Sequence, residues 1–185
     1  MLIILDRDGV INRYDGNYIC SAEEWEPIPG SMEAIARLCN AGHRIAIATN
    51  QSGIARGFYD ADELDAMHAK LEQLLEAQGG CIDYIAYCPH HPDDHCPCRK
   101  PLTGLLEQIR SHFHLDSLQD AIMVGDSRKD LEAGHKAGCH PVLVRTGNGL
   151  DTERHLDTRP IPGARVSIYD SLSTFATALL SAEGW

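Results

Sequence analysis

The chain has 185 residues, of which 43% are hydrophobic and 23% are charged. This length and composition are typical of one globular domain with a sizeable hydrophobic core. Its 16 basic and 27 acidic side chains give a net charge of −11, which argues against nucleic acid or an anionic membrane as a partner, because both require a basic face.

Strands and helices alternate along almost the whole sequence. Continuous apolar runs predict buried strands, and apolar residues spaced three or four apart predict helices. The predicted strands are Leu2–Leu5, Arg44–Ala48, Ile82–Cys88, Ala121–Asp126, Pro141–Gly147 and Val166–Ile168. The predicted helices are Ser31–Ala41, one that begins after a capping aspartate at Asp60, Thr103–Phe113, Arg128–Gly138 and Leu172–Leu180.

This alternation predicts an α/β domain over residues 1–185, with a doubly wound, Rossmann-like parallel sheet and helices on both faces. The polar, proline-containing segment 150–163 is expected to be an irregular loop. Trp25 and Trp185 are expected to be packing residues. Ligands of such sheets bind outside the carboxyl ends of the strands, so the residues that follow each strand are the candidates for function.

Two features of the sequence favour a cytoplasmic location. No apolar run approaches the roughly 20 residues that span a bilayer, and acidic Asp6 interrupts the first apolar run too early for a signal peptide. In the cytoplasm the seven cysteines stay reduced, so their spacing is more informative than their number.

Polar clusters follow four of the predicted strands. Asp6 and Asp8 come after the first strand, "TNQSG" (49–53) comes after the second, "RKP" (99–101) lies in the loop after the third, and "GDSRKD" (125–130) follows the fourth. Each cluster alone is a weak signal, because an aspartate pair is more often a turn or a helix cap. Their joint placement at one edge of a parallel sheet is a strong one.

The side chains in these clusters suit phosphoryl transfer. Carboxylates held close together require a cation among them, and hard oxygen ligands are those that Mg²⁺ prefers. The hydroxyl of Thr49 and the backbone N–H groups near it can donate to phosphate oxygens, and Lys100 adds a positive charge. A carboxylate nucleophile, a metal ion, phosphate-binding donors and a cation are what transfer through an aspartyl-phosphate requires.

"DRDGVIN", "TNQSG", "RKP" and "GDSRKD", in this order, resemble the four motifs of the haloacid dehalogenase (HAD) superfamily of phosphatases. Within that superfamily, "TNQSGIARG" (49–57) is most similar to the heptose bisphosphate phosphatases. The resemblance covers residues 2 to about 147. It implies a hydrolase that removes the C7 phosphate of D-glycero-D-manno-heptose 1,7-bisphosphate, in the supply of heptose precursors for lipopolysaccharide or an S-layer.

The resemblance also implies roles for individual residues. Asp6 would be the nucleophile that attacks phosphorus, and Asp8 would protonate the leaving oxygen and then activate water. Mg²⁺ would be held by the carboxylates of Asp6 and Asp126 and by the backbone carbonyl of Asp8. The implied residues that contact or neutralise the phosphoryl group are Thr49, Asn50 and Lys100, with Asp130 behind them.

Further substrate contacts are expected from Gln51, Ser52, Arg56 and Arg99. A solvated loop arginine is nearly as good an interpretation of Arg56. The heptose bisphosphatases carry a lysine after the motif aspartate, where this chain has Ser127. Either Lys129 supplies that charge, or one substrate contact is missing.

The loop "CPHHPDDHCPCRKP" contains a C-x-H-x5-C-x-C array. Two close pairs of soft ligands in a polar loop fit tetrahedral Zn²⁺, and four protein ligands leave no open position, which indicates a structural ion. The predicted ligands are Cys88, His90, Cys96 and Cys98. Either His91 or His95 could replace His90, which the resemblance favours, and four unligated loop residues are the plainer alternative. Such an ion would fix the loop that holds Lys100.

No separate cap domain fits between the first two clusters or between the second and the third. We therefore expect the loop Arg13–Ser21 and the zinc loop (88–98) to shape an open mouth, which suits an extended, polar substrate such as a phosphorylated sugar. A monomer is expected.

Three other functions compete with this interpretation. A histidinol-phosphate phosphatase shares the motifs and a similar zinc spacing, but diverges after "TNQ". A polynucleotide 3′-phosphatase is disfavoured by the net charge of −11. A non-catalytic, zinc-stapled scaffold is disfavoured by the complete set of catalytic residues.

Overall fold

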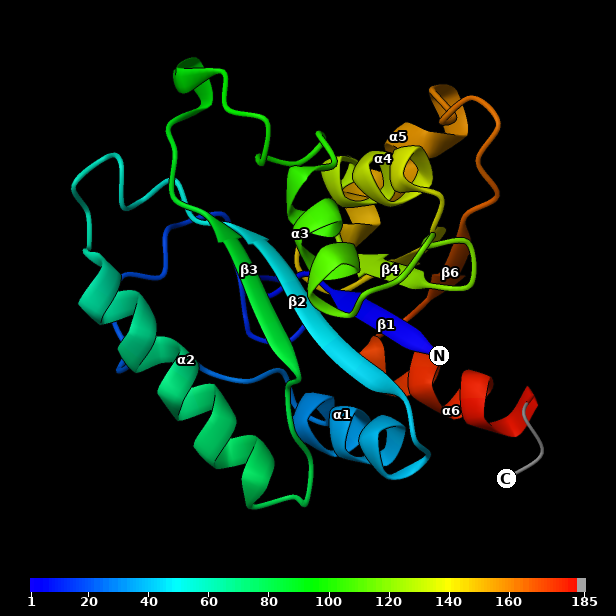
Figure 1. The fold of residues 1–185 in the computed structure, drawn as a ribbon, viewed down its shortest axis with the longest axis horizontal. Coiled ribbons are helices and arrows are strands. Elements are labelled where there is room, and N and C mark those ends of the chain that lie inside the picture. Colours follow the sequence, from blue (N-terminus) through cyan, green and yellow to red (C-terminus); the bar gives the residue numbers. More distant parts are fainter. Residues whose placement is uncertain (183–185) are drawn as a thin grey trace.

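Six parallel strands form one sheet in the computed structural model, which describes residues 1–182. Their spatial order is β3-β2-β1-β4-β5-β6 (Figure 1). The strands are β1 (Leu2–Leu5), β2 (Arg44–Asn50), β3 (Tyr84–Cys88), β4 (Ile122–Gly125), β5 (His140–Val144) and β6 (Ser167–Tyr169). The predicted α/β fold with a doubly wound parallel sheet is therefore confirmed.

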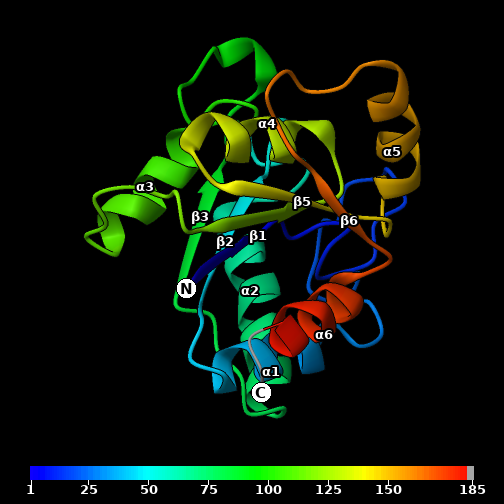
Figure 2. The ribbon, with the colours of Figure 1, turned by 90° about the vertical axis from the view of Figure 1, so that its right-hand side faces the viewer.

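Helices cover both faces of this sheet. Figure 2 shows α1, α2 and α6 on one face, and α3 and α4 on the other. The helices are α1 (Ser31–Asn40), α2 (Ala61–Glu76), α3 (Gly104–His112), α4 (Arg128–Ala137), α5 (Gly149–Thr158) and α6 (Leu172–Ala182), with a short 3-10 helix η1 (Pro92–Asp94). None of the helices within residues 1–182 is long and apolar enough to cross a membrane.

Two cores result from the period-two alternation of the strands. Ile3 and Leu5 of β1 pack in the core that contains α1, α2 and α6, whereas Ile4 packs against α3 and α4. Burial on both faces explains why the strands are continuous apolar runs in the sequence. Trp25 is fully buried in the first core, as expected, and Trp185 lies outside the described residues.

The strand order reverses at β1, and this reversal positions the site. The chain leaves β1 to build β2 and β3 on one side, and later builds β4, β5 and β6 on the other. Leu5 is in register with Ile47 of β2 and with Val124 of β4. The residues that follow these three strands therefore meet at the crevice where α/β sheets bind their ligands.

Residues 149–158 form a helix, which corrects the expectation of an irregular loop over 150–163. No side-chain cap marks the start of α5. Its support is tertiary: the Thr152 hydroxyl donates to the backbone oxygen of Asp126 at 2.8 Å, and Leu156 packs against a small buried cluster around Leu131. A sequence pattern does not reveal contacts of this kind.

The connections that follow β1 and β2 are loops without a cap domain in the described chain. The predicted cap of α2 is present, because the Asp60 side chain accepts from the Glu63 backbone N–H at 2.9 Å. The zinc loop (88–98) links β3 to α3 and projects beyond the end of the sheet (Figure 1).

Candidate active site

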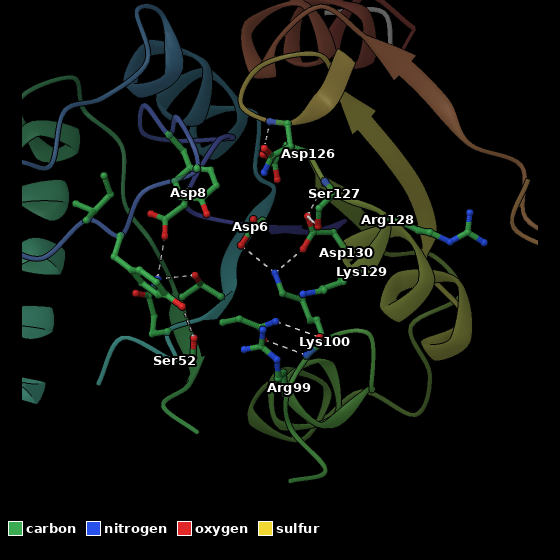
Figure 3. Close-up of a pocket in the computed structure, with 18 of the residues that line it drawn as sticks. Asp6, Asp8, Ser52, Arg99, Lys100, Asp126, Ser127, Arg128, Lys129 and Asp130 are labelled. Atoms are coloured by element: carbon green, nitrogen blue, oxygen red, sulfur yellow. Dashed lines mark hydrogen bonds and ion pairs between the residues drawn. The ribbon is translucent and has the colours of Figure 1, made fainter. Parts of the chain in front are cut away.

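An open pocket lies at the carboxyl ends of β1, β2 and β4. It brings together residues from all four predicted clusters, and Figure 3 shows them converging from different elements. The predicted residues that line it are Asp6, Asp8, Thr49, Asn50, Gln51, Ser52, Arg99, Lys100 and Asp126.

Lys100 lies between two carboxylates at the floor of the pocket (Figure 3). Its Nζ donates to Asp6 Oδ1 at 2.9 Å, to Asp130 Oδ1 at 2.6 Å and to the Ala48 carbonyl at 2.7 Å. All three ammonium protons therefore have acceptors, although the residue is only 2% exposed. Burial alone would lower the pKa of Lys100, but the charges of Asp130 and Asp6 outweigh it and raise that pKa above its ordinary value.

Three buried carboxylates, those of Asp6, Asp126 and Asp130, lie within 4.8 Å of one another. Burial, followed by the charge of Asp130, raises the pKa of Asp6 to about 7 and that of Asp126 to about 8. One ammonium cannot balance three negative charges, so a further cation would relieve the repulsion. The oxygen-only donor set fits Mg²⁺.

Both oxygens of the Asp130 carboxylate already accept hydrogen bonds. Its Oδ1 accepts from Lys100, and its Oδ2 accepts from the backbone N–H and the hydroxyl of Ser127 at 3.1 and 2.9 Å. Among residues 1–182, in contrast, no donor reaches Oδ2 of Asp6 or Oδ1 of Asp126. Those two oxygens are the ones that remain for a metal ion.

The carboxylate of Asp126 sits in a backbone cradle. A Cβ on Gly9 would lie 2.1 Å from Asp126 Oδ2, and one on Gly147 would lie 2.3 Å from it. The backbone N–H of Asn148 donates to the same oxygen at 2.8 Å. Glycine is therefore required at both positions, because any larger residue would displace the carboxylate.

The Asp8 carboxylate is separate from the cluster of three. Its Oδ1 accepts from Arg7 Nε at 2.9 Å and from Asn12 Nδ2 at 3.0 Å, and its Oδ2 accepts from Gln51 Nε2 at 3.3 Å. This separation agrees with a metal contact through the Asp8 backbone and a different task for its side chain.

The two predicted phosphate contacts from β2, Thr49 and Asn50, differ in the direction of their side chains. Thr49 lines the pocket and its Oγ1 accepts from Gln51 Nε2 at 2.9 Å. The Asn50 side chain instead pairs with the backbone of Lys100, donating to its oxygen at 3.1 Å and accepting from its N–H at 3.0 Å. That amide therefore fixes the position of Lys100.

Cationic side chains surround one side of the pocket mouth. Arg99 Nη1 is buried and has no hydrogen-bond partner within the described chain. Burial, and then the nearby charge of Arg99, lowers the pKa of Lys129. Arg128 points away from the pocket (Figure 3) and pairs with Glu132 at 2.6 Å. Arg99 and Lys129 are thus the cations available to an anion at the rim.

The position of Arg56 differs from that of the other predicted contacts. It is exposed and does not line the pocket; its guanidinium lies 5.8 Å from the centre of the Tyr18 ring. Tyr18 does line the pocket, and its hydroxyl is 3.2 Å from Ser52 Oγ. Arg56 therefore borders the site through Tyr18.

The four predicted zinc ligands form one cluster. Cys88 Sγ lies 3.5 Å from both His90 Nδ1 and Cys96 Sγ, and Cys98 Sγ lies 3.2 Å from His90 Nδ1 and 3.6 Å from Cys96 Sγ. His91 instead caps η1 by accepting from the Asp93 backbone. Three thiols and one imidazole at these separations fit a tetrahedral Zn²⁺ site.

Sequence reasoning missed a buried network behind the pocket, formed by Arg7, Tyr59 and His68. Arg7 is a charged residue between two aspartates, so nothing in its sequence context indicated that its side chain is buried. Tyr59 comes from the loop before α2, and His68 comes from the middle of that helix. The position of His68 four residues after Leu64, on the apolar face of α2, was the only available signal.

The sequence of the chain is similar to those of known phosphatases. A family model described as HAD-hydrolase-like matches residues 97–173. A Pseudomonas aeruginosa protein named D-glycero-beta-D-manno-heptose-1,7-bisphosphate 7-phosphatase is 53% identical, over 97% of both chains. A Pseudomonas putida protein of the same name is 50% identical, over 97% of this chain and 99% of its own.

A solved structure agrees with these relatives. It is a crystal structure of a D,D-heptose 1,7-bisphosphate phosphatase from B. bronchiseptica, complexed with magnesium and phosphate. It superposes with a TM-score of 0.92 at 45% identity and covers 98% of both chains. The similarity thus extends over nearly the whole length of the chain.

Proposed function

The chain belongs to the heptose 1,7-bisphosphate phosphatases of the HAD-like hydrolases, and from this membership we propose that it hydrolyses the C7 phosphate ester of D-glycero-D-manno-heptose 1,7-bisphosphate. The observation that carries the proposal is the contact of Lys100 with Asp6 beside the Asp126 carboxylate. Asp6 supplies the nucleophile, Lys100 supplies a positive charge for the phosphoryl group, and Asp126 supplies a ligand for a cation.

Asp6 and Asp8 divide the reaction between them. The Asp6 carboxylate attacks phosphorus and forms an aspartyl-phosphate as the bond to the C7 oxygen breaks. Asp8 gives a proton to that oxygen, and then takes a proton from the water that attacks the acyl phosphate. Lys100 offsets the negative charge that collects around the phosphoryl group, and the Thr49 hydroxyl donates a hydrogen bond to it.

The carboxylates of Asp6 and Asp126, with the backbone carbonyl of Asp8, are the proposed ligands of Mg²⁺. The bound ion supplies positive charge next to the phosphoryl oxygens. Mg²⁺ at this place is supported by the excess of buried negative charge and by the magnesium and phosphate in the B. bronchiseptica structure.

The second phosphate of the substrate binds at the cationic rim. Arg99 Nη1 has no hydrogen-bond partner among residues 1–182, and burial lowers the pKa of Lys129, whose charged neighbours include Arg99; Lys129 stands two residues after Ser127. We assign the beta anomer as substrate, because the two Pseudomonas relatives are named for it. Ser52 and Arg56 remain candidates for contacts to the rest of the substrate, whereas the side-chain amides of Asn50 and Gln51 already bind other residues of the site.

Zn²⁺ in the cluster of Cys88, His90, Cys96 and Cys98 has a structural role. The last ligand, Cys98, directly precedes Arg99 and Lys100, so a bound ion fixes the segment that carries these two basic side chains. We further propose a single-domain monomer that works in the cytoplasm. Size-exclusion chromatography with light scattering tests the monomer.

The test is Mg²⁺-dependent phosphate release, measured as kcat/KM on both anomers of heptose 1,7-bisphosphate and on histidinol phosphate. The Asp6→Asn protein serves as the blank. Preference for the beta anomer, lost in that variant, is the expected result. Preference for histidinol phosphate would replace the substrate, and turnover by Asp6→Asn would overturn the assigned nucleophile.

A further inference from the structure

The Arg7 side chain is completely buried and every one of its N–H groups has an acceptor. Nε and Nη2 lie 2.9 and 2.8 Å from Asp8 Oδ1, and Nη2 also donates to Gln51 Oε1 at 3.4 Å. Nη1 donates to Met67 Sδ at 3.6 Å and lies 3.3 Å from His68 Nε2. Because a guanidinium only donates, each atom that faces it must accept.

His68 satisfies this requirement. Burial, and then the charge of Arg7, lowers the pKa of His68 to about 4, so the imidazole is neutral at ordinary pH. Its Nε2 therefore accepts from Arg7 and its proton resides on Nδ1. Arg7 is thus held from behind by a neutral partner, and its charge is directed to Asp8.

The Gln51 amide has only one orientation that this network allows. Its Oε1 faces Arg7 and also accepts from the Tyr59 hydroxyl at 2.5 Å, whereas its Nε2 faces Asp8 Oδ2 at 3.3 Å. Arg7 only donates and a carboxylate only accepts, so both ends of the amide require the same orientation.

This orientation determines what Thr49 can do. Gln51 Nε2 donates to Thr49 Oγ1 at 2.9 Å, so the hydroxyl accepts on its inner side. Its own proton finds no acceptor among residues 1–182 and is left for a ligand in the pocket that Thr49 lines.

We propose that Arg7, acting through the Gln51 amide, is a positioning residue that points the Thr49 hydroxyl proton at the transferring phosphoryl group and holds the Asp8 carboxylate for proton transfer. The proposal rests on the phosphatase function proposed above. In this proposal Gln51 lies buried beneath the substrate and does not contact it. It contributes to the reaction by donating hydrogen bonds to Asp8 and to Thr49 at the same time.

The sharpest test is Gln51→Glu, which keeps the size of the side chain but turns its donor into an acceptor. The Thr49 hydroxyl then donates its hydrogen bond to the new carboxylate, and Asp8 faces a like charge. We expect kcat/KM for heptose 1,7-bisphosphate to fall by about 100-fold or more, the usual effect of losing one transition-state donor. Gln73→Glu, the same change on the exposed face of α2, is the matched control.

Two readouts separate positioning from simple damage to the fold. In Gln51→Glu, the burst of 4-nitrophenolate released from 4-nitrophenyl phosphate should fall less than the turnover of heptose 1,7-bisphosphate. The nitrophenolate leaving group needs no proton from Asp8. In a Thr49→Val background, Gln51→Glu should lower kcat/KM by a smaller factor than it does in the wild type, because the hydroxyl that it misdirects is absent.

The outcomes are distinct. A folded Gln51→Glu protein with wild-type kcat/KM, or fully additive losses with Thr49→Val, would overturn the positioning role while an inactive Asp6→Asn protein leaves the phosphatase function in place. Turnover by Asp6→Asn would remove the proposed function itself. If Gln51→Glu does not fold, the uncharged Gln51→Met replaces it, and the same non-additivity with Thr49→Val is expected.

Discussion

Lys100 Nζ donates a hydrogen bond to Asp6 Oδ1 at 2.9 Å, across 94 positions of the sequence. The same ammonium reaches Asp130 at 2.6 Å, so one cation joins the end of β1 to the start of α4. The loop after β3 therefore supplies part of the positive charge that offsets the cluster of buried carboxylates.

Lys100→Met should lower both activity and stability. It leaves two facing carboxylates without their cation, and breaking a buried pair typically costs about 3–5 kcal/mol. We expect urea unfolding to show a loss of that size and kcat/KM to fall by about 100-fold or more. Unchanged stability would mean that water or a metal ion already balances Asp6 and Asp130.

Mg²⁺ binding should weaken as the pH falls. The raised pKa values, about 7 for Asp6 and about 8 for Asp126, mean that both carboxyls hold protons below those values in the metal-free protein. A cation must displace these protons, so its affinity should be lower at about pH 6 than at about pH 8.5. Calorimetry in buffers of different ionisation enthalpy measures the affinity and the protons released; an affinity independent of pH would contradict the prediction.

Gly9→Ala should reduce Mg²⁺ affinity specifically. The added Cβ would lie 2.1 Å from Asp126 Oδ2, and Gly9 has a φ of +88°. Gly42→Ala is the matched control, because Gly42 has a φ of +87° with open space around it. Both variants should lose about 1 kcal/mol of stability to backbone strain. Only Gly9→Ala should also bind Mg²⁺ at least about 10-fold more weakly, since the ligand itself is displaced.

Loss of zinc should lower activity through Lys100. Cys96→Ser removes one ligand, and we expect less than one equivalent of zinc by elemental analysis and a lower melting temperature. Misplacing a catalytic group by about 1 Å can cost about 100-fold, so kcat/KM with saturating Mg²⁺ should also fall. Cys20→Ser, outside the cluster, should keep zinc and activity; full activity of a zinc-free Cys96→Ser protein would refute the structural role.

Lys129→Met should affect bisphosphates more than monophosphates. If Lys129 and Arg99 hold the second phosphate, KM for heptose 1,7-bisphosphate rises by about 10-fold, while a sugar monophosphate is hydrolysed as before. Lys136→Met, on the exposed side of the same helix, is the control. An equal rise in KM for both kinds of substrate would place Lys129 at the reacting phosphate instead.

The sequence was informative where one strong pattern decides the structure. Ile3, Ile45 and Val124 belong to apolar runs, and burial between two helical layers leaves such runs few alternatives to a parallel sheet. Strand order then brings the polar ends together, so Asp6 and Asp126 could be placed in one site before any contact was known.

Other features depend on contacts that no local pattern encodes. Helix α5 lacks a side-chain cap and is held by Thr152 on the backbone of Asp126. The burial of Arg7 follows from acceptors on α2, which lie 60 and 61 positions away. The Asn50 amide faces the Lys100 backbone for the same reason: a side chain at a strand end can turn to several partners, and tertiary packing selects one.

The two-way pairing of Asn50 with the Lys100 backbone also has an evolutionary consequence. The zinc loop is fastened at both ends, by β3 at Cys88 and by Asn50 at Lys100. The turn around η1 between these anchors is mostly exposed, and its residues do not line the pocket. Its length can therefore vary between the proposed zinc ligands His90 and Cys96 without moving the lysine, as long as the four ligands are kept, so this turn tolerates sequence change while the chemistry stays the same.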